Sequence, residues 1–200
     1  MTENTSENTN VVAAQLRAWN GKAVSEVIEF RGETTMVVPR EMMLEVCAYC
    51  LQDPNLQFNL LTDATCVDRF PMEPRFEVNY HLVSIPRKVR LRLKTKLPGS
   101  DPVMDSMVPV WPGANWLERE VYDMSGVTFK GHPDLRRILM YPEFEGHPLL
   151  KDYPAQRTQP LIPYRTEDEA GVPLEKLPPF RADEGMSFGR RPFTETDEPS

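Results

Sequence analysis

Two neighbouring stretches of alternating apolar and polar residues constrain the fold of this chain most. Residues 76–82 place Phe, Val, Tyr and Leu between polar residues, and residues 89–97 place Val, Leu and Thr between Arg and Lys. A period of two sends successive side chains to opposite faces of a strand. Pro86-Arg87-Lys88 between the stretches is typical of a hairpin turn. The pair therefore predicts a sheet with one apolar face that must be covered and one polar face.

Amphipathic helices that could cover this face are predicted at residues 11–19 and 40–53, where apolar residues recur at helical spacing. Further strands are predicted at residues 24–31, 34–38 and 60–70. The resulting order is helix, two strands, helix, three strands, helix. It predicts an α+β domain of two layers, with a mostly antiparallel or mixed sheet and helices on one face.

A third helix is predicted at residues 116–125 from the residues at its ends. Asn115 is a favourable N-cap, and Glu118 three positions later completes a capping box. Gly126 suits the left-handed position that follows a helix. Gly and Pro then interrupt any helical period as far as residue 154, so residues 127–154 are predicted to form a charged interaction loop.

The rest of the chain flanks a single domain at residues 11–126. With 200 residues and 40% apolar composition the chain can bury one core. Residues 1–10 are polar and are predicted to be disordered. Residues 155–200 contain seven prolines, and we expect them to form an extended C-terminal arm that gains order on a partner.

Charged residues of the third helix and the loop predict an ion-pair network. Glu118 and Glu120 point to different sides of a helix and cannot share a proton, whereas Arg119 and Asp123 are spaced to pair. We expect Arg119, Arg136 and Arg137 to bind the neighbouring carboxylates, or those of another chain, through paired hydrogen bonds.

His132 and His147 offer two alternatives. With Asp134, Glu143 and Glu145 they could form a metal or acid–base site. Each histidine, however, lies in a Gly-His-Pro tripeptide, and their spacing of 15 residues matches no helical ligand pair. A hydrogen bond that holds a turn is the favoured interpretation.

Cys47-Ala-Tyr-Cys50 could be a redox pair or half of a metal site. Both cysteines fall on the apolar face of the predicted helix, in its second half, whereas a redox pair lies at a helix N-terminus. They are therefore interpreted as small core residues.

Net charge bounds the possible partners. A charge of −7 argues against a nucleic-acid binder. The polar face of the predicted sheet nevertheless carries a basic row, which we expect to pair with Glu77 or with an acidic patch on a partner. The row consists of Arg90, Arg92, Lys94 and Lys96.

No apolar run is long enough to span a bilayer, so membrane contact is expected only through a partner.

The segments E-R-E-V-Y-D-M-S-G-V-T-F-K-G-H-P-D-L-R-R-I-L-M and E-G-H-P-L-L-K-D-Y-P closely resemble the signature of one family, the 30-kilodalton (C) subunit of proton-translocating NADH:quinone oxidoreductase, respiratory complex I. The likeness extends more loosely over residues 11–154. The signature and interface positions that this resemblance implies are Glu118, Arg119, Glu120, Asp123, Gly126, His132, Pro133, Asp134, Arg136, Arg137, Gly146, His147, Lys151 and Asp152.

The resemblance implies a subunit of the peripheral arm on the cytoplasmic side of the bacterial inner membrane. Its implied neighbours are the 49-kilodalton (D) subunit and the B and I subunits. FMN, iron–sulfur clusters and quinone would be bound by other subunits of the complex, which passes electrons from NADH to quinone and translocates protons. This chain would bind no cofactor or metal, would supply no catalytic residue and would scaffold the quinone-reducing module.

Two alternatives stay open at this point. One is a stand-alone metal or acid–base enzyme that uses the His132 and His147 loop. The other is the same scaffold role in a related oxidoreductase fed by ferredoxin or a deazaflavin.

Overall fold

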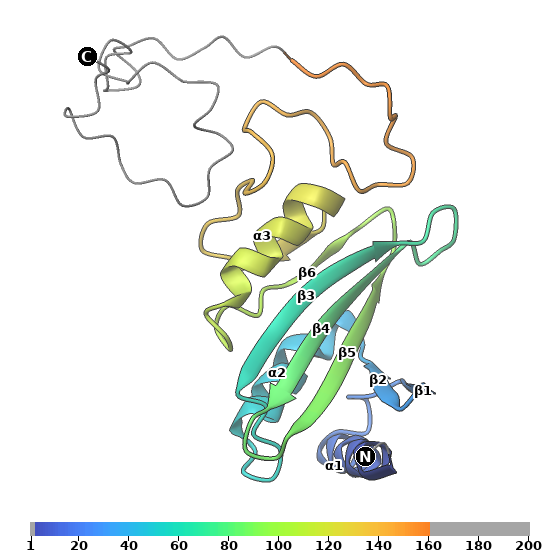
Figure 1. Ribbon diagram of the computed structural model, residues 1–200, viewed down its shortest axis with the longest axis vertical. Helices are drawn as coiled ribbons and strands as arrows, with labels where there is room; N and C mark the ends of the chain where they lie inside the picture. Colours follow the sequence, from blue (N-terminus) through green and yellow to red (C-terminus); the bar gives the residue numbers. More distant parts are fainter. Residues whose placement is uncertain (1–2, 161–200) are drawn as a thin grey trace, which may run out of the picture. The chain divides into compact units, whose positions relative to one another are not determined.

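A computed structural model describes residues 3–160 of the chain, and side-chain exposure is described from Val11 onward. Its main sheet has five strands in the order β1-β2-β5-β4-β3 (Figure 1). The strands are β1 (Glu26–Phe30), β2 (Glu33–Val37), β3 (Leu60–Asp68), β4 (Phe76–Ser84) and β5 (Val89–Leu97). The predicted α+β architecture is confirmed.

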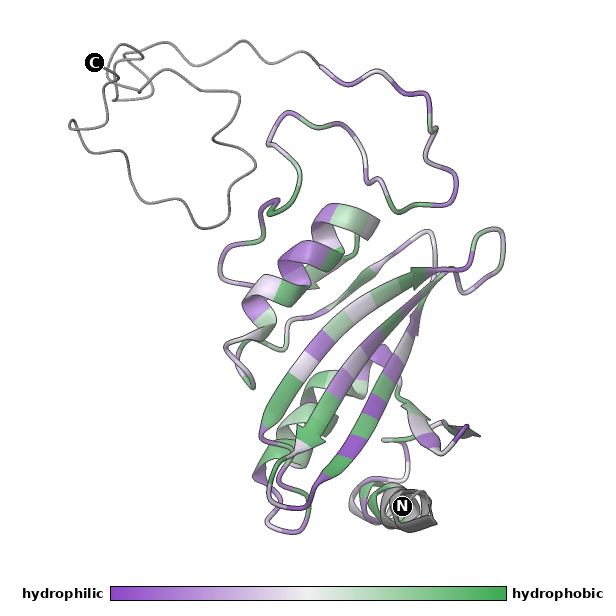
Figure 2. Ribbon diagram, viewed as in Figure 1, coloured by the Kyte–Doolittle hydropathy of each residue, from purple (hydrophilic) through white to green (hydrophobic). Residues whose placement is uncertain are grey.

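The hairpin of β4 and β5 is the centre of this sheet. Its antiparallel register pairs Tyr80 with Leu93 and Leu82 with Leu91, and all four side chains are buried. Hydrophilic and hydrophobic residues alternate along β5 (Figure 2). The sheet therefore has one face in the core and one polar face, as the alternation predicts.

Three helices lie against the apolar face. They are α1 (Glu3–Trp19), α2 (Met43–Gln52), which follows the short 3₁₀ helix Arg40–Met42, and α3 (Ala114–Ser125). Figure 1 shows α2 behind the sheet. Trp19 at the end of α1 stacks on Tyr49 of α2, with ring centroids 4.6 Å apart. Together these helices complete the second layer of the domain.

Strand pairing is mixed, because β2 is antiparallel to β1 but parallel to β5. Two further strands, β6 (Val103–Asp105) and β7 (Thr128–Lys130), pair in parallel as a separate small sheet. Neither was predicted, since three residues are too few to show a period of two. The first part of the predicted loop is thus a strand, and residues 131–160 contain no helix or strand.

Both ends of the chain bear on the predicted domain limits. Helix α1 begins at Glu3, so residues 3–10 are helical where the sequence predicts disorder. The buried residues Val12 and Leu16 anchor the C-terminal half of α1, and an anchored helix extends by one backbone hydrogen bond per added residue. Residues 161–200, most of the predicted arm, lie outside the described residues, so the arm stays a prediction.

No helix within the described part is long and apolar enough to cross a membrane.

Candidate interaction site

The first turn of α3 differs from the predicted capping box. The helix begins one residue before Asn115, and its N-cap is Gly113 without any side-chain cap. The backbone N–H groups of Ala114 and Asn115 donate instead to the carbonyls of Trp111 and Pro112. Because these donors are already satisfied by the preceding turn, the side chain of Glu118 is free to bond elsewhere.

Glu118 is fully buried and ties α3 to the segment that follows β6. Its carboxylate accepts hydrogen bonds from the Ser106 hydroxyl and the Met107 N–H, both at 2.6 Å, and from the Tyr80 hydroxyl at 3.4 Å. Burial raises the pKa of Glu118 to about 7, although these donors act in the opposite direction. The capping prediction missed this role because Ser106 and Met107 lie outside the local window that a capping rule reads.

Asp123 attaches the irregular segment that follows β7, residues 131–160, to the second half of α3. Its Oδ2 accepts from the backbone N–H groups of Ile138, Leu139 and Met140 at 3.0, 2.8 and 2.8 Å. Its Oδ1 accepts from the Arg137 guanidinium at 2.6 Å. Burial acts to raise the pKa of Asp123, but the hydrogen bonds from these backbone groups and from Arg137 outweigh it and leave the pKa lowered. The carboxylate thus holds one turn of the segment in a defined shape.

Among the described residues, the predicted carboxylate contacts form for Arg136 and Arg137, each through one nitrogen and not through paired hydrogen bonds, and do not form for Arg119. Arg119 binds no carboxylate within residues 3–160; its guanidinium donates to the backbone carbonyls of Arg136 and Arg137, both at 3.1 Å. Arg136 pairs with Asp134 at the surface, where both side chains are more than half exposed. Arg137 forms the buried carboxylate pair with Asp123 and also donates to the carbonyl of Gly146 at 2.9 Å. A chain that turns back on a helix offers carbonyls as well as carboxylates, and residue type cannot distinguish which acceptor an arginine meets.

Both histidines bond to backbone carbonyls of α3, which confirms the interpretation that they hold turns. His147 Nδ1 lies 2.9 Å from the carbonyl of Asp123. His132 Nε2 lies 3.2 Å from the carbonyl of Asn115, while its Nδ1 accepts from the N–H of Asp134. His132 therefore fastens the start of the segment to the first turn of the helix, and His147 fastens a later part of it to the last turn.

Position 126 requires glycine for two reasons, the conformation of its backbone and the closeness of the His147 ring. Its φ is 77°, in the left-handed region predicted for the residue after the helix. A Cβ at this position would lie 2.8 Å from the ring of His147. The glycine therefore allows the histidine to close over the end of α3.

A second attachment joins the segment to the β3–β4 hairpin. Arg75 bonds the carboxylate of Asp68 at 2.7 and 2.9 Å and that of Asp152 at 2.6 and 3.2 Å. The backbone N–H of Lys151 also donates to Asp68, at 2.9 Å. The Arg75 hydrogen bonds hold the pKa of Asp68 at about 2. Sequence reasoning missed Asp68 and Arg75, because nothing local connects them to Asp152 more than 75 residues away.

The segment is thus fastened internally while its outer surface stays available. Leu139 and Leu149 are each 57% exposed, and Trp116 on α3 is 63% exposed with the Arg119 guanidinium over its ring. Glu120 is exposed on the same helix. Such a surface, with apolar side chains on a rigid frame, is suited to contact with another protein.

The cysteines are where packing predicts them. Cys47 and Cys50 are fully buried, and burial raises the pKa of both thiols, for Cys50 to about 12. A thiol with so high a pKa is a poor nucleophile. Within residues 3–160, no three His, Cys, Asp or Glu side chains gather in a way that could hold a metal ion.

Fold and site together define a class: a two-layer α+β module that presents a rigid, irregular segment along its third helix. Comparison with known proteins identifies the family. Residues 36–159 match the family described as "Respiratory-chain NADH dehydrogenase, 30 Kd subunit", and the chain belongs to this family. The family resemblance inferred from the sequence is thereby confirmed.

Named relatives agree with this assignment. The C subunit of the NADH-quinone oxidoreductase of Geobacter sulfurreducens is 50% identical over 148 residues, which cover 74% of this chain and 90% of the relative. A C/D subunit of the same oxidoreductase from Methylococcus capsulatus is 39% identical over 166 residues, which cover 80% of this chain and 28% of the relative.

Solved structures show the same fold. A trypsin-resistant fragment of Nqo5 is 33% identical with a TM-score of 0.55, covering 64% of this chain and 99% of the fragment. A chain from the membrane-bound sulfane sulfur reductase, an archaeal respiratory membrane complex, is 25% identical with a TM-score of 0.63, covering 74% of this chain and 86% of that one.

Proposed function

We propose that the chain is a scaffold subunit in the peripheral arm of a bacterial NADH:quinone oxidoreductase, where it holds the quinone-reducing subunits in register. Family membership supports the choice of complex. The segment after β7 supports the scaffold role, since its buried attachments fix a surface that another subunit could recognise without an ordering cost on binding.

The observation that carries this proposal is the C/D relative of Methylococcus capsulatus. The alignment covers only 28% of that relative. The region similar to this chain is therefore joined in one polypeptide to a much longer remainder. Two polypeptides that function as one fused chain are ordinarily neighbours when separate. We therefore infer that the 49-kilodalton (D) subunit contacts this chain, with the B and I subunits nearby.

Redox chemistry is assigned to the neighbours in this proposal. FMN and iron–sulfur clusters would carry electrons from NADH to quinone in other subunits, and the complex as a whole would couple this transfer to proton translocation. The site supports such a division of roles, because its histidines bond to backbone carbonyls and Asp123 bonds to backbone N–H groups and an arginine. These groups stabilise the fold and are not directed at a common reaction centre.

The location follows from the complex. We propose a peripheral position at the inner membrane of a bacterial cell, on the cytoplasmic side, with membrane contact made only through partner subunits.

One observation favours a second candidate, in which the chain is a subunit of a different respiratory complex. The similarity to a chain of an archaeal sulfane sulfur reductase complex shows that this fold also serves a respiratory complex of another kind. NADH-dependent reduction of quinone by the complex that contains this chain would decide for the NADH-fed machine.

The interaction surface can be tested with matched charge insertions. Leu139→Glu and Met72→Glu both replace exposed apolar side chains, 57% and 66% exposed, but only Leu139 lies on the segment attached to α3. We expect the D, B and I subunits to co-purify from membranes with a tagged Met72→Glu chain. Leu139→Glu should recover much less of the D subunit. Equal recovery from both variants would contradict the proposed surface.

A further inference from the structure

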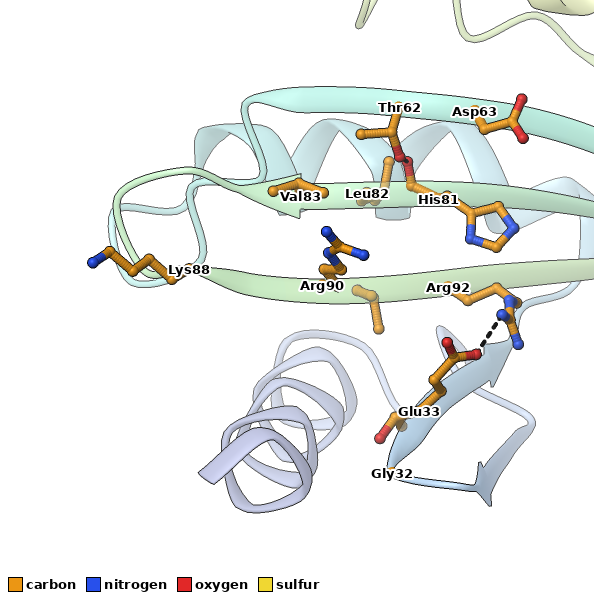
Figure 3. A pocket seen from close by; sticks show the side chains of 12 residues that line it. Gly32, Glu33, Thr62, Asp63, His81, Leu82, Val83, Lys88, Arg90 and Arg92 are labelled. Atoms are coloured by element: carbon orange, nitrogen blue, oxygen red, sulfur yellow. Dashed lines mark hydrogen bonds and ion pairs between the residues drawn. The ribbon is translucent and has the colours of Figure 1, made fainter. Parts of the chain in front are cut away.

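The polar face of the sheet contains a hollow of about 590 Å³ on the side opposite α2 (Figure 3). It is bounded by the β1–β2 turn at Gly32 and by the parts of β3, β4 and β5 nearest to that turn. Its volume lies within the range of ligand-binding pockets. Polar side chains from four strands line it: Glu33, Thr62, Asp63, His81, Arg90 and Arg92.

Two cations of this hollow differ in their engagement. Arg92 is held by Glu33 at 2.6 Å and by the hydroxyl of Thr35 at 3.2 Å. Arg90, two residues earlier on β5, is exposed and has no ion-pair partner among residues 3–160. Figure 3 shows its guanidinium between β4 and β5, facing the open side of the sheet. Lys88, which also borders the hollow, is likewise exposed.

His81 adds hydrogen-bonding capacity without adding charge. Burial and the nearby Arg92 lower its pKa, so the imidazole is neutral near pH 7. Asp63 on β3 lies directly across from it in the strand register. Thr62 and Asp63 thus lie on the β3 side of the hollow, Glu33 on β2 is occupied by Arg92, and the cations without an ion-pair partner among the described residues, Arg90 and Lys88, lie on the β5 side.

Farther along the same face the basic side chains have carboxylate partners. Lys94 and Arg69 both bond Glu77 at 2.9 Å, and Lys96 lies 3.8 Å from Glu26. The predicted pairing with Glu77 is therefore confirmed for Lys94. Within residues 3–160, unpaired positive charge on the row is left at its Arg90 end, next to Lys88.

We propose that this hollow binds an acidic peptide segment of a partner chain, with Arg90 and Lys88 receiving its carboxylates. A guanidinium binds carboxylates through two parallel hydrogen bonds, and complementary charge both steers the encounter and fixes its register. A nucleic acid is disfavoured because no Phe, Tyr or Trp of the described residues lines the hollow for base stacking. This surface is separate from the segment attached to α3.

The test uses the isolated full-length chain and a fluorescein-labelled peptide of six glutamates, with a peptide of six glutamines as the uncharged control. Fluorescence anisotropy should show salt-sensitive binding of the glutamate peptide only. Arg90→Glu should weaken that binding about tenfold, and Arg90→Gln should weaken it less. Lys130→Glu, which reverses an exposed charge on β7 of the other sheet, should leave binding unchanged.

Two results would overturn the proposal. One is equal binding by the native chain, the Arg90→Glu variant and the Lys130→Glu variant. The other is tighter binding to a single-stranded DNA 12-mer or to anionic phospholipid vesicles than to the glutamate peptide. Both measurements use the chain alone, so their failure is distinguishable from failure of the proposed role in the oxidoreductase.

Discussion

Replacement of Asp123 by Asn is expected to release the irregular segment from α3 while the sheet stays intact. Asp123 has a fully buried side chain, accepts three backbone N–H groups and pairs with Arg137, which is 17% exposed. Removal of one partner from a buried ion pair costs about 3–5 kcal/mol. Because an amide offers one oxygen and adds N–H donors of its own, Asn cannot replace the lost acceptors.

This cost should appear as local opening, since the freed backbone groups can turn to water if the segment detaches. A cost of about 3 kcal/mol corresponds to roughly a hundredfold increase in the opening equilibrium. Amide hydrogen exchange measured by mass spectrometry should therefore accelerate by that factor in peptides covering residues 136–150. Exchange in β4 and β5 should not change.

Asp134→Asn is the matched control, because it makes the same substitution in the same segment. Asp134 and Arg136 are 55% and 72% exposed, and surface pairs contribute about 0–1 kcal/mol. Exchange in this control should stay within about fivefold of the native chain. If the two variants exchanged equally fast, the segment would not be held by Asp123.

Two further perturbations test buried groups elsewhere in the core. Since folding raises the pKa of Glu118 from 4.5 to about 7, the folded state keeps a proton that the unfolded state loses, so the free energy of unfolding should fall by about 3 kcal/mol as pH rises from 4.5 to above 7. Denaturant titrations at pH 5 and pH 8 should show this decrease in the native chain and not in Glu118→Gln; an equal decrease in both would contradict the assignment. Replacing Cys47 and Cys50 together by Ala should lower stability by about 2–4 kcal/mol and leave the iron–sulfur signals of the purified complex unchanged, whereas loss of a signal would contradict the packing interpretation.

Features that depend on a local period or on backbone chemistry could be predicted from the sequence. Alternation placed β4 and β5, helical spacing placed Cys47 and Cys50 in the core, and Gly126 marked the end of α3. The histidine turns were also predictable, because proline restricts the backbone next to each histidine. In each case the decisive neighbours lie within a few residues, or the pattern repeats often enough to be recognised.

Features that depend on distant partners could not be predicted. The parallel pairing of β2 with β5 joins strands more than 50 residues apart, and a period of two does not say which strands are neighbours. Glu118 satisfied a local capping pattern, but its actual donors Ser106 and Met107 come from another segment. Nothing near Arg75 indicated its ion pair, because its partner Asp152 follows much later in the chain.

Activity per assembled complex is the most direct test of the scaffold role. NADH:quinone reductase activity and the amount of intact complex should be measured together in membranes from strains carrying the native chain, Asp123→Asn or Asp134→Asn. The scaffold role predicts that Asp123→Asn lowers the amount of assembled complex and total activity in equal proportion, so that their ratio stays at the native value. A normal amount of complex with a lowered ratio would contradict it and would assign this chain a direct part in catalysis.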